Sequence, residues 1–492
     1  MSALSGLLDA GSVVAAHHPW PRAVIDPPVW QVATQLVASG GLTLLSLWGE
    51  PGVVHMALYD PVEREAGVLS LGCPEGRYPS VGAQHPPAVR LERSLYDLFG
   101  LEPVGLADRR PWLDHGRWGD EARPADSYPF LPARGEALHQ IPVGPVHAGI
   151  IEPGHFRFTC DGETVVRLEE RLGYVHKGVD LLMAGASLER AAKLASRVSG
   201  DSTVAYALAF ARAVEAATGT EPPARAVALR AVMAELERIA NHIGDFGAIC
   251  NDASFSIMLA HCAVLREKVL RAAAAGFGHR MMMDRIVPGG VAVDPDVSAL
   301  SAVRAAVAEV AAVLPPLVRL YDNTTSLQDR TVSTGILKPA LARQFGAGGY
   351  IGRASGRDFD ARRDVPYPPY DALTFEIPVL VQGDVNARVW IRLREVDQSL
   401  KLLVWLLDTL PDGPVLAHLA GDSGEGVAMA EAFRGDVLVW LRVGGGRVER
   451  CHLRDASWFQ WPLLEAAIEG NIVADFPLCN KSFNCSYSGH DL

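Results

Sequence analysis

Four long segments with the spacing of an amphipathic helix constrain the fold of this 492-residue chain more than any other feature. In residues 225–247, apolar side chains recur three and four positions apart, which places them on one face of a helix. They are Leu229, Val232, Met233, Leu236, Ile239, Ala240 and Ile243. The same spacing runs through residues 258–274, 297–320 and 385–410. The second part of the chain is therefore predicted to be mainly a helical bundle, with strands and turns at its ends.

The first part of the chain, to about residue 130, has a different pattern. Short apolar runs such as LTLLSLWG, VVHMALYD and AGVLSLG alternate with Gly and Pro, which predicts a small mixed α/β domain. Residues 109–142 are rich in Pro, Gly, Asp and Trp without a period, which is typical of a linker. We expect an N-terminal domain over residues 1–137 and a second domain over residues 138–492. The fold class would be α+β.

Charge and cysteine usage exclude several classes of protein. The net charge of -12 argues against a nucleic-acid-binding protein, which normally has a basic face. The seven cysteines include no CxxC pair, so neither a disulfide framework nor a zinc ribbon is predicted. The N-terminus lacks the basic start and apolar core of a secretory signal. We expect reduced thiols in a cytoplasmic protein.

One uncharged stretch, residues 27–49, has the length of a membrane span. It is interrupted by Pro27, Pro28, Gly40 and Gly41, which favour a short helix, a turn and a strand instead. No transmembrane helix is predicted.

The segment ERSLYDLFGLEPVGLADRRPWLDHGRW, residues 92–118, supports two interpretations. Its periodicity predicts a helix with Glu92, Arg93 and Asp97 on a solvated face and apolar residues pointing inward. As a whole string it resembles the signature of the C-type subunit of respiratory complex I. The resemblance implies a module that docks other subunits and carries no cofactor.

The remainder of the chain resembles the D-type subunit of complex I and, more closely, the large subunit of membrane-bound [NiFe] hydrogenases of the formate hydrogenlyase type. The segments that carry this resemblance include IPVGPVHAGIIEPGHFRF (141–158), RLGYVHKGVDLL (171–182), ELERIANHIGDFG (235–247), GRASGRDFDARRDVPYPPYD (352–371) and NIVADFPL (471–478). Fusion of C-type and D-type modules in one chain is itself a habit of such hydrogenase subunits.

The family's nickel site needs four thiolates, because soft sulfur ligands hold nickel. The resemblance places Ser199 and Ser202 at the first two cysteine positions, and Ser486 and Gly489 at the last two, with Cys485 one place early. Serine hydroxyls are weak ligands for nickel and glycine offers none. We therefore expect that the chain has lost the nickel ligands and binds no metal. A substitute site would draw on Cys479, Cys485, His490, His147 and Cys160, whereas the alternative is that these cysteines are small buried hydrophobes.

Quinone reduction is the other chemistry that the resemblance implies. His147 matches the hairpin histidine that contacts the quinone head group, but Gly200 falls where the partner tyrosine would be. Arg434 matches the arginine above the metal in hydrogenases. Arg353, Ser355, Asp358 and Asp360 belong to a turn that faces the same cavity in the family, and the alternative is a buried ion-pair network. A charged cluster with a candidate proton path comprises Glu152, His155, His176 and Lys177.

From this resemblance we expect a peripheral subunit of a membrane-bound, hydrogenase-related redox complex, on the inner face of the cell membrane. Its partners would be a small iron–sulfur subunit, which holds the clusters, and integral-membrane antiporter-like subunits. His147 and Arg434 are the predicted catalytic residues. The predicted ligand-binding residues are His147, Ser199, Ser202, Arg353, Asp358 and Ser486. The alternatives are a quinone-reducing subunit and a purely structural scaffold.

Overall fold

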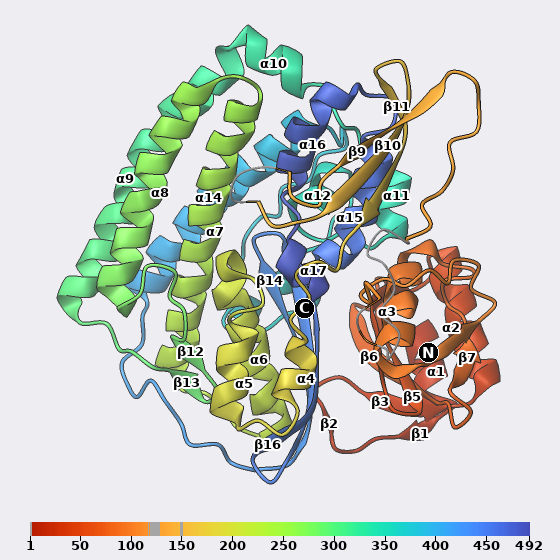
Figure 1. The fold of residues 1–492 in the computed structure, drawn as a ribbon. Helices are drawn as coiled ribbons and strands as arrows, with labels where there is room; N and C mark the ends of the chain where they lie inside the picture. The colour runs from red at the N-terminus through yellow and green to blue at the C-terminus, as the bar shows by residue number, and fades with distance from the viewer. Residues whose placement is uncertain (1, 117, 119–127, 148–150) are drawn as a thin grey trace.

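The computed structural model describes residues 2–116, 118, 128–147 and 151–492. Its N-terminal part is a five-stranded sheet in the order β1-β3-β6-β5-β4 with three helices against it (Figure 1). The strands of this sheet are β1 (Ser12–Val13), β3 (Arg22–Ile25), β4 (Thr43–Glu50), β5 (Val53–Asp60) and β6 (Glu65–Gly72), and the helices are α1 (Ala3–Asp9), α2 (Pro27–Ser39) and α3 (Val89–Phe99). Strands β7 (Arg77–Pro79) and β8 (Glu102–Val104) form a separate parallel pair.

The helix, turn and strand predicted for residues 27–49 are confirmed. Helix α2 begins with two prolines, which suit the first turn because its N–H groups have no partner within the helix. It ends at Gly40, whose φ of 81° is a left-handed conformation that glycine adopts without strain. Strand β4 follows, so this uncharged stretch lies in a folded domain.

The long helices predicted from spacing are also confirmed. Residues 225–247 lie in α7 (Ala224–Asp252), and the other three segments lie in α8 (Ser256–Phe277), α9 (Val297–Asn323) and α14 (Val385–Asp408). These four helices form a bundle at one end of the molecule (Figure 1). By length and composition alone, α9 would be long and apolar enough to cross a membrane, and 28% of its most apolar stretch is buried.

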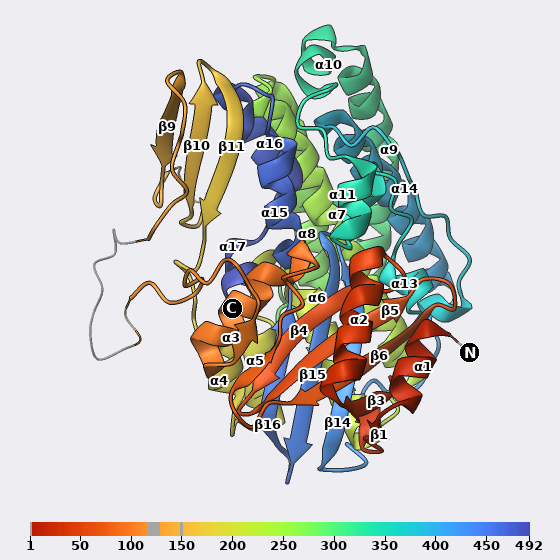
Figure 2. The same cartoon turned by 90° about the vertical axis from the view of Figure 1, so that its right-hand side faces the viewer.

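A second sheet joins the two parts of the chain. It has the order β16-β15-β14-β2, in which β2 (His17–His18) comes from the N-terminal part. Strands β14 (Gly424–Ala432), β15 (Gly435–Gly444) and β16 (Arg447–Arg454) are antiparallel, and β2 pairs parallel to β14. Helix α6 (Thr203–Thr218) packs on β14 and β15. Figure 2 shows the N-terminal sheet in front of these strands, with α2 on its outer side.

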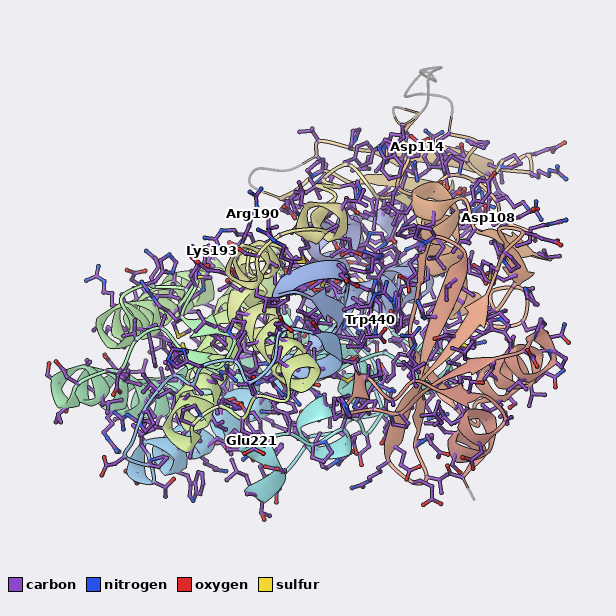
Figure 3. The ribbon with its side chains drawn as sticks, turned by 90° about the horizontal axis from the view of Figure 1, so that it is seen from below. Asp108, Asp114, Arg190, Lys193, Glu221 and Trp440 are labelled. Carbon is purple, nitrogen blue, oxygen red and sulfur yellow. The ribbon has the colours of Figure 1, made fainter. Side chains whose placement is uncertain are left out.

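Aromatic rings and an ion pair fill the junction between the two sheets. The rings of Trp48 and His452 stack with centroids 4.9 Å apart, and Trp440 is fully buried beside them. Arg22 pairs with Glu425 across the junction. In Figure 3, Trp440 lies between the N-terminal sheet and the helices. The boundary predicted near residue 137 stays a prediction. Residues from before and after it belong to the same two buried apolar clusters.

The remaining elements are two small sheets and several short helices. A third sheet comprises β9 (Leu138–Val143), β10 (His155–Asp161) and β11 (Thr164–Arg171), and a two-stranded ladder comprises β12 (Ile286–Val287) and β13 (Gly290–Val291). The shorter helices are α4 (Val179–Met183), α5 (Leu188–Ala195), α10 (Thr325–Thr331), α11 (Pro339–Gln344), α12 (Gly349–Ala354), α13 (Ala361–Asp364), α15 (Ser457–Ala467), α16 (Phe476–Phe483) and α17 (Tyr487–Asp491).

The solvated face predicted for residues 92–97 is wrong. Glu92 is fully buried, and its carboxylate accepts hydrogen bonds from the Ser80 hydroxyl at 2.7 Å and from two backbone N–H groups. Arg93 is also buried and lies over the ring of Trp112. Asp97 accepts hydrogen bonds from the N–H groups of residues 112–114. Glu92 thus holds residues 80–82 before the helix, and Arg93 and Asp97 hold residues 110–114 after it, so periodicity alone misassigned these side chains.

Candidate functional site

The segments expected to supply nickel ligands meet in the interior. Ser199 precedes α6, and Ser486 is the N-cap of α17. Their hydroxyl oxygens lie 2.9 Å apart, although 287 positions separate them in the sequence. The Ser486 hydroxyl also accepts the N–H of Gly489 at 2.9 Å. The structure therefore brings together the positions that the resemblance aligned with the metal site.

Arg434 lies in the turn between β14 and β15 and reaches the same place. Its guanidinium donates to both carboxylate oxygens of Asp201, one of them at 2.8 Å. It also donates to the Ser202 hydroxyl at 3.2 Å and to the carbonyl oxygen of Asn484 at 2.5 Å. The Ser199 hydroxyl donates to Asp201 at 2.8 Å. One hydrogen-bonded network thus connects three predicted serines with the predicted arginine.

Asp201 is the centre of this network, and the sequence reasoning missed it. Its position between Ser199 and Ser202 was the available signal. Burial acts to raise the pKa of Asp201, but the charge and hydrogen bonds of Arg434 outweigh it, so the pKa lies below its ordinary value. The carboxylate is therefore ionised at neutral pH.

Gly489 has no room for a side chain. A Cβ atom built on it would lie 2.7 Å from a carboxylate oxygen of Asp455 and 2.9 Å from the Ser486 hydroxyl oxygen. Asp455 is held there by the hydroxyl of Tyr206, which donates to it at 2.7 Å. A cysteine at this position would require Asp455 to move.

The donor set at this place does not fit a [NiFe] centre. Three hydroxyls and a glycine stand at the four positions, and the hydroxyls are already hydrogen-bonded to one another or to the Asp201–Arg434 pair. Such a centre requires four soft thiolates. Cys485, next to Ser486, is buried, and burial raises the pKa of its thiol well above the ordinary value.

The residues considered for a substitute metal site have other contacts. His490 stacks on Trp458 with ring centroids 4.1 Å apart, and its Nδ1 lies 2.8 Å from Asp491. Cys479 and Cys160 are fully buried. Across the described ranges, no three His, Cys, Asp or Glu side chains are grouped so that they could hold a metal ion.

His147 lies in the loop between β9 and β10, apart from the serine network. Its Nε2 is buried and has no hydrogen-bond partner among the described residues, and burial lowers the pKa of the imidazole. Its ring lies 5.5 Å from that of Phe156 and 6.3 Å from that of Tyr487. Gly200 offers no hydroxyl. Tyr487 is instead a tyrosine that the fold brings beside His147.

The turn at residues 352–360 divides into a buried and an exposed part. Arg353 is fully buried and pairs with Glu395 at 2.8 Å and with Glu431 at 2.9 Å. Asp360, also buried, lies 3.3 Å from Arg353. Asp358 is exposed and pairs with Arg363 instead. Arg353 and Asp360 thus belong to a buried ion-pair network, which was the alternative prediction for this turn, whereas Asp358 lies outside it.

The charged cluster considered as a proton path is held by the C-terminal segment. Glu152 accepts the N–H of Ser488 at 3.0 Å, and Nδ1 of His176 lies 2.6 Å from the carbonyl oxygen of Asp491. Nδ1 of His155 lies 3.2 Å from the carbonyl oxygen of Gly144. Lys177 is half-buried, and burial lowers the pKa of its ammonium. These contacts anchor α17, and a role in proton transfer stays a prediction.

Glu237 is a second acidic residue that the sequence reasoning missed. It is buried on α7 and accepts hydrogen bonds from the N–H groups of Val204 at 2.7 Å and Ala205 at 3.2 Å, at the start of α6. Burial raises the pKa of Glu237 to about 8, although these N–H groups act to lower it. Asp201 nearby also raises it. This carboxyl group is therefore largely protonated at neutral pH.

Comparison with known proteins gives four consistent matches: one family, two relatives and one solved structure. Residues 252–421 match the family described as respiratory-chain NADH dehydrogenase, 49 kDa subunit. The chain is 31% identical to formate hydrogenlyase subunit 5 of Escherichia coli, over 89% of this chain and 82% of that protein. It is 31% identical to the carbon monoxide-induced hydrogenase of Rhodospirillum rubrum, over 71% of this chain and 98% of that protein. It also resembles a solved chain of a membrane-bound sulfane sulfur reductase, an archaeal respiratory membrane complex. That match has a TM-score of 0.68 and 26% identity, and it covers 73% of this chain and 99% of the other.

The Asp201–Arg434 pair predicts a coupled loss of stability. We expect Arg434→Gln and Asp201→Asn each to lower the free energy of unfolding by about 2 kcal/mol, because each leaves a charged partner without its hydrogen bonds. The double variant should lose at least about 1 kcal/mol less than the sum of the two single losses. Because the pKa of Asp201 is depressed in the fold, this coupling should disappear as the pH falls below about 4. Denaturant unfolding at several pH values measures it.

Arg197→Gln is the matched control. The side chain of Arg197 is 44% exposed and that of Arg434 is 5% exposed, whereas their aspartate partners are similarly exposed, 32% for Asp284 and 35% for Asp201. We expect Arg197→Gln to cost less than about 1 kcal/mol. Additive losses for Asp201 and Arg434 would contradict the proposed network.

Glu237 predicts a stability that falls with rising pH. Its pKa is about 8 in the fold and about 4.3 in the unfolded chain, so the folded state binds more protons between these values. Raising the pH from 5 to 9 should therefore destabilise the protein, and Glu237→Gln should remove about 1–3 kcal/mol of that loss. Chemical denaturation across this range tests it. Glu189→Gln, an exposed change on α5, should leave the pH dependence as it is, and an equal effect of both variants would contradict the assignment.

Proposed function

The chain belongs to the family of formate hydrogenlyase-type hydrogenase large subunits and complex I 49 kDa subunits. We propose that, unlike a hydrogenase, it works without a nickel centre, because hydroxyls and a glycine stand at the four aligned ligand positions. In this proposal it is a peripheral subunit of a membrane-bound redox complex. The curated relatives are named as subunits of formate hydrogenlyase, membrane-bound hydrogenase and NADH-quinone oxidoreductase.

The observation that carries the proposal is the closed network at the four aligned ligand positions. The hydroxyls of Ser199, Ser202 and Ser486 are linked directly or through Asp201 to Arg434, and Gly489 is packed against Asp455. An ionised carboxylate paired with a guanidinium is a stable neutral unit. The subunit would thus keep the fold of the family while lacking its hydrogen chemistry.

The partners and location are part of the same proposal. A small iron–sulfur subunit would carry the clusters, and integral-membrane antiporter-like subunits would anchor the complex. The relatives belong to multi-subunit membrane complexes, which supports such an arrangement. The subunit would sit on the inner face of the membrane. Glu92, which holds residues 80–82 before α3, and Asp97, which holds residues 112–114 after it, would support the docking module.

A quinone site is the second candidate, and the unpartnered Nε2 of His147 favours it. A neutral imidazole with a depressed pKa can donate or accept a hydrogen bond at a carbonyl oxygen. Tyr487, with its ring 6.3 Å from that of His147, would take the place of the tyrosine missing at Gly200. His147 and Tyr487 would then hold the head group, while the serine network would close the space behind them.

The proposal predicts that the purified complex contains no stoichiometric nickel in this subunit. Because hydroxyls replace thiolates, cells grown with nickel should yield a tagged complex with iron from its partners and far less than one nickel per chain. Elemental analysis by mass spectrometry measures both metals in one sample. A formate hydrogenlyase prepared in parallel shows that nickel survives the purification. One nickel per chain that persists after chelation would refute the proposal.

The quinone candidate predicts a separate effect of His147. We expect His147→Ala to lower quinone-dependent electron transfer at least tenfold in an assembled complex, because a hydrogen bond to the head group is lost. Tyr487→Phe should raise KM for the quinone. His139→Ala, on the exposed side of β9, is the control and should leave the activity as it is. If His147→Ala changes neither kcat nor KM, the subunit has the scaffold role instead.

A further inference from the structure

The helical bundle leaves an apolar groove open between α9 and α14. Figure 1 shows α9 at the outer edge of the molecule, and Figure 2 shows it next to α14. The groove is a cavity of about 880 Å³ lined only by residues of these two helices. Its walls include Val307, Ala311 and Leu314 from α9, and Leu393, Leu400 and Val404 from α14. Val307, Leu314, Leu393 and Leu400 form its buried floor, and Ala311 and Val404 stand exposed at its rim. A concave, mostly apolar site of this kind is the usual form of a ligand site.

The two helices run antiparallel, which fixes the level of each side chain along the groove. At one end, Arg304 of α9 pairs with Asp408 of α14 at 2.5 Å. At the other end, the ring of Tyr321 lies 6.4 Å from that of Trp390. Counted from the Arg304–Asp408 pair at 1.5 Å per residue, Arg319 lies about 22 Å along α9 and Arg394 about 21 Å along α14. These two arginines therefore lie at the same level along the groove, at one end of it.

Arg319 and Arg394 carry positive charges that nothing in the described chain balances. The other charged side chains lining the groove are paired, since Lys401 binds Asp397 at 2.6 Å and Arg304 binds Asp408. Neither Arg319 nor Arg394 makes a side-chain hydrogen bond or an ion pair within the residues that the structure describes. Two like charges beside an apolar surface repel each other and attract an anion.

We propose that this groove binds an anionic phospholipid, with its phosphate between Arg319 and Arg394 and an acyl chain along the groove toward Arg304. Guanidinium groups bind phosphate through paired N–H donors, which matches the charged end. The distance of about 21 Å exceeds the roughly 15 Å of one leaflet's hydrocarbon, so an extended acyl chain fits. The volume also falls in the range of lipid-sized and drug-sized sites, about 300–1,000 Å³.

The charges favour a lipid over the apolar face of a partner helix. A phosphate between Arg319 and Arg394 would satisfy both guanidinium groups. A helix that covers the groove with apolar side chains alone would leave both charges without a partner. This inference is independent of the metal and quinone proposals, because none of their residues lines the groove.

The test is lipid binding by the full-length protein. We expect native mass spectrometry to show one phosphatidylglycerol per chain, and flotation to recover the protein with vesicles of phosphatidylcholine mixed with phosphatidylglycerol but not with phosphatidylcholine alone. Arg319→Glu/Arg394→Glu should weaken binding at least tenfold by reversing both charges. Ala311→Trp, which fills the groove, should do the same. Equal binding of both vesicle types would overturn the proposal.

Two controls match these variants. Arg190→Glu reverses an exposed arginine on α5, labelled in Figure 3, and Ala312→Trp enlarges the neighbouring exposed alanine that does not line the groove. Both should bind lipid as the unmodified protein does, and thermal unfolding should show all variants folded. Inorganic phosphate should displace no more lipid than chloride does when both salts are added at the same ionic strength. Displacement by phosphate, or full binding by Ala311→Trp, would show an anion site without a lipid groove and overturn the proposal.

Discussion

The ion pair between Arg434 and Asp201 is the contact on which the interior of this protein depends. Arg434 is 4% exposed, and a guanidinium so buried is stable only when its charge and its N–H donors are satisfied. Asp201 supplies the charge, Ser202 accepts a further hydrogen bond, and the Asn484 carbonyl accepts the last. These partners come from the start of α6 and from the C-terminal segment. A single side chain on the β14–β15 turn therefore holds together three regions that are distant in sequence.

The same principle operates where the helical bundle meets the sheet. Arg353 of α12 binds Glu395 of α14 and Glu431 of β14, and Glu395 accepts a hydrogen bond from His242 of α7. Burial acts to raise the pKa of Glu395, yet the charge of Arg353 and the bond to His242 bring it to about 2. Within this network each charge is neutralised within one contact of the next, as a low-dielectric interior requires. Buried ion pairs add little net stability but fix one geometry, which here sets how the helices cross the sheet.

Much of the fold could be predicted because local sequence determines it. Apolar spacing located α7, α8, α9 and α14, and the prolines and Gly40 set the limits of α2. The candidate site was only partly predictable. Alignment to a family pattern located Ser199, Ser202, Ser486 and Arg434, but it could not show that Asp201 neutralises Arg434 or that Tyr487 lies beside His147. Those contacts join residues more than 200 positions apart and follow from tertiary packing. The burial of Glu92 and Arg93 escaped periodicity for the same reason, because their partners lie in loops outside the helix.

Gly489 shows why the proposed loss of the metal site involves more than its ligands. Three of the four positions differ from cysteine by one atom, so Ser→Cys changes there would supply thiols with little change in volume. At Gly489 a side chain meets Asp455, which is fixed by the Tyr206 hydroxyl and by the N–H of Ser457 at 2.8 Å. The hydroxyl oxygen of Ser457 in turn accepts a hydrogen bond from the N–H of Ser486 at 2.9 Å. Displacing Asp455 would therefore disturb the N-cap of α17 and the hydroxyl that Ser199 contacts. On the proposal that the metal site is lost, restoring it would therefore require a change in the packing around Gly489 as well as four thiols.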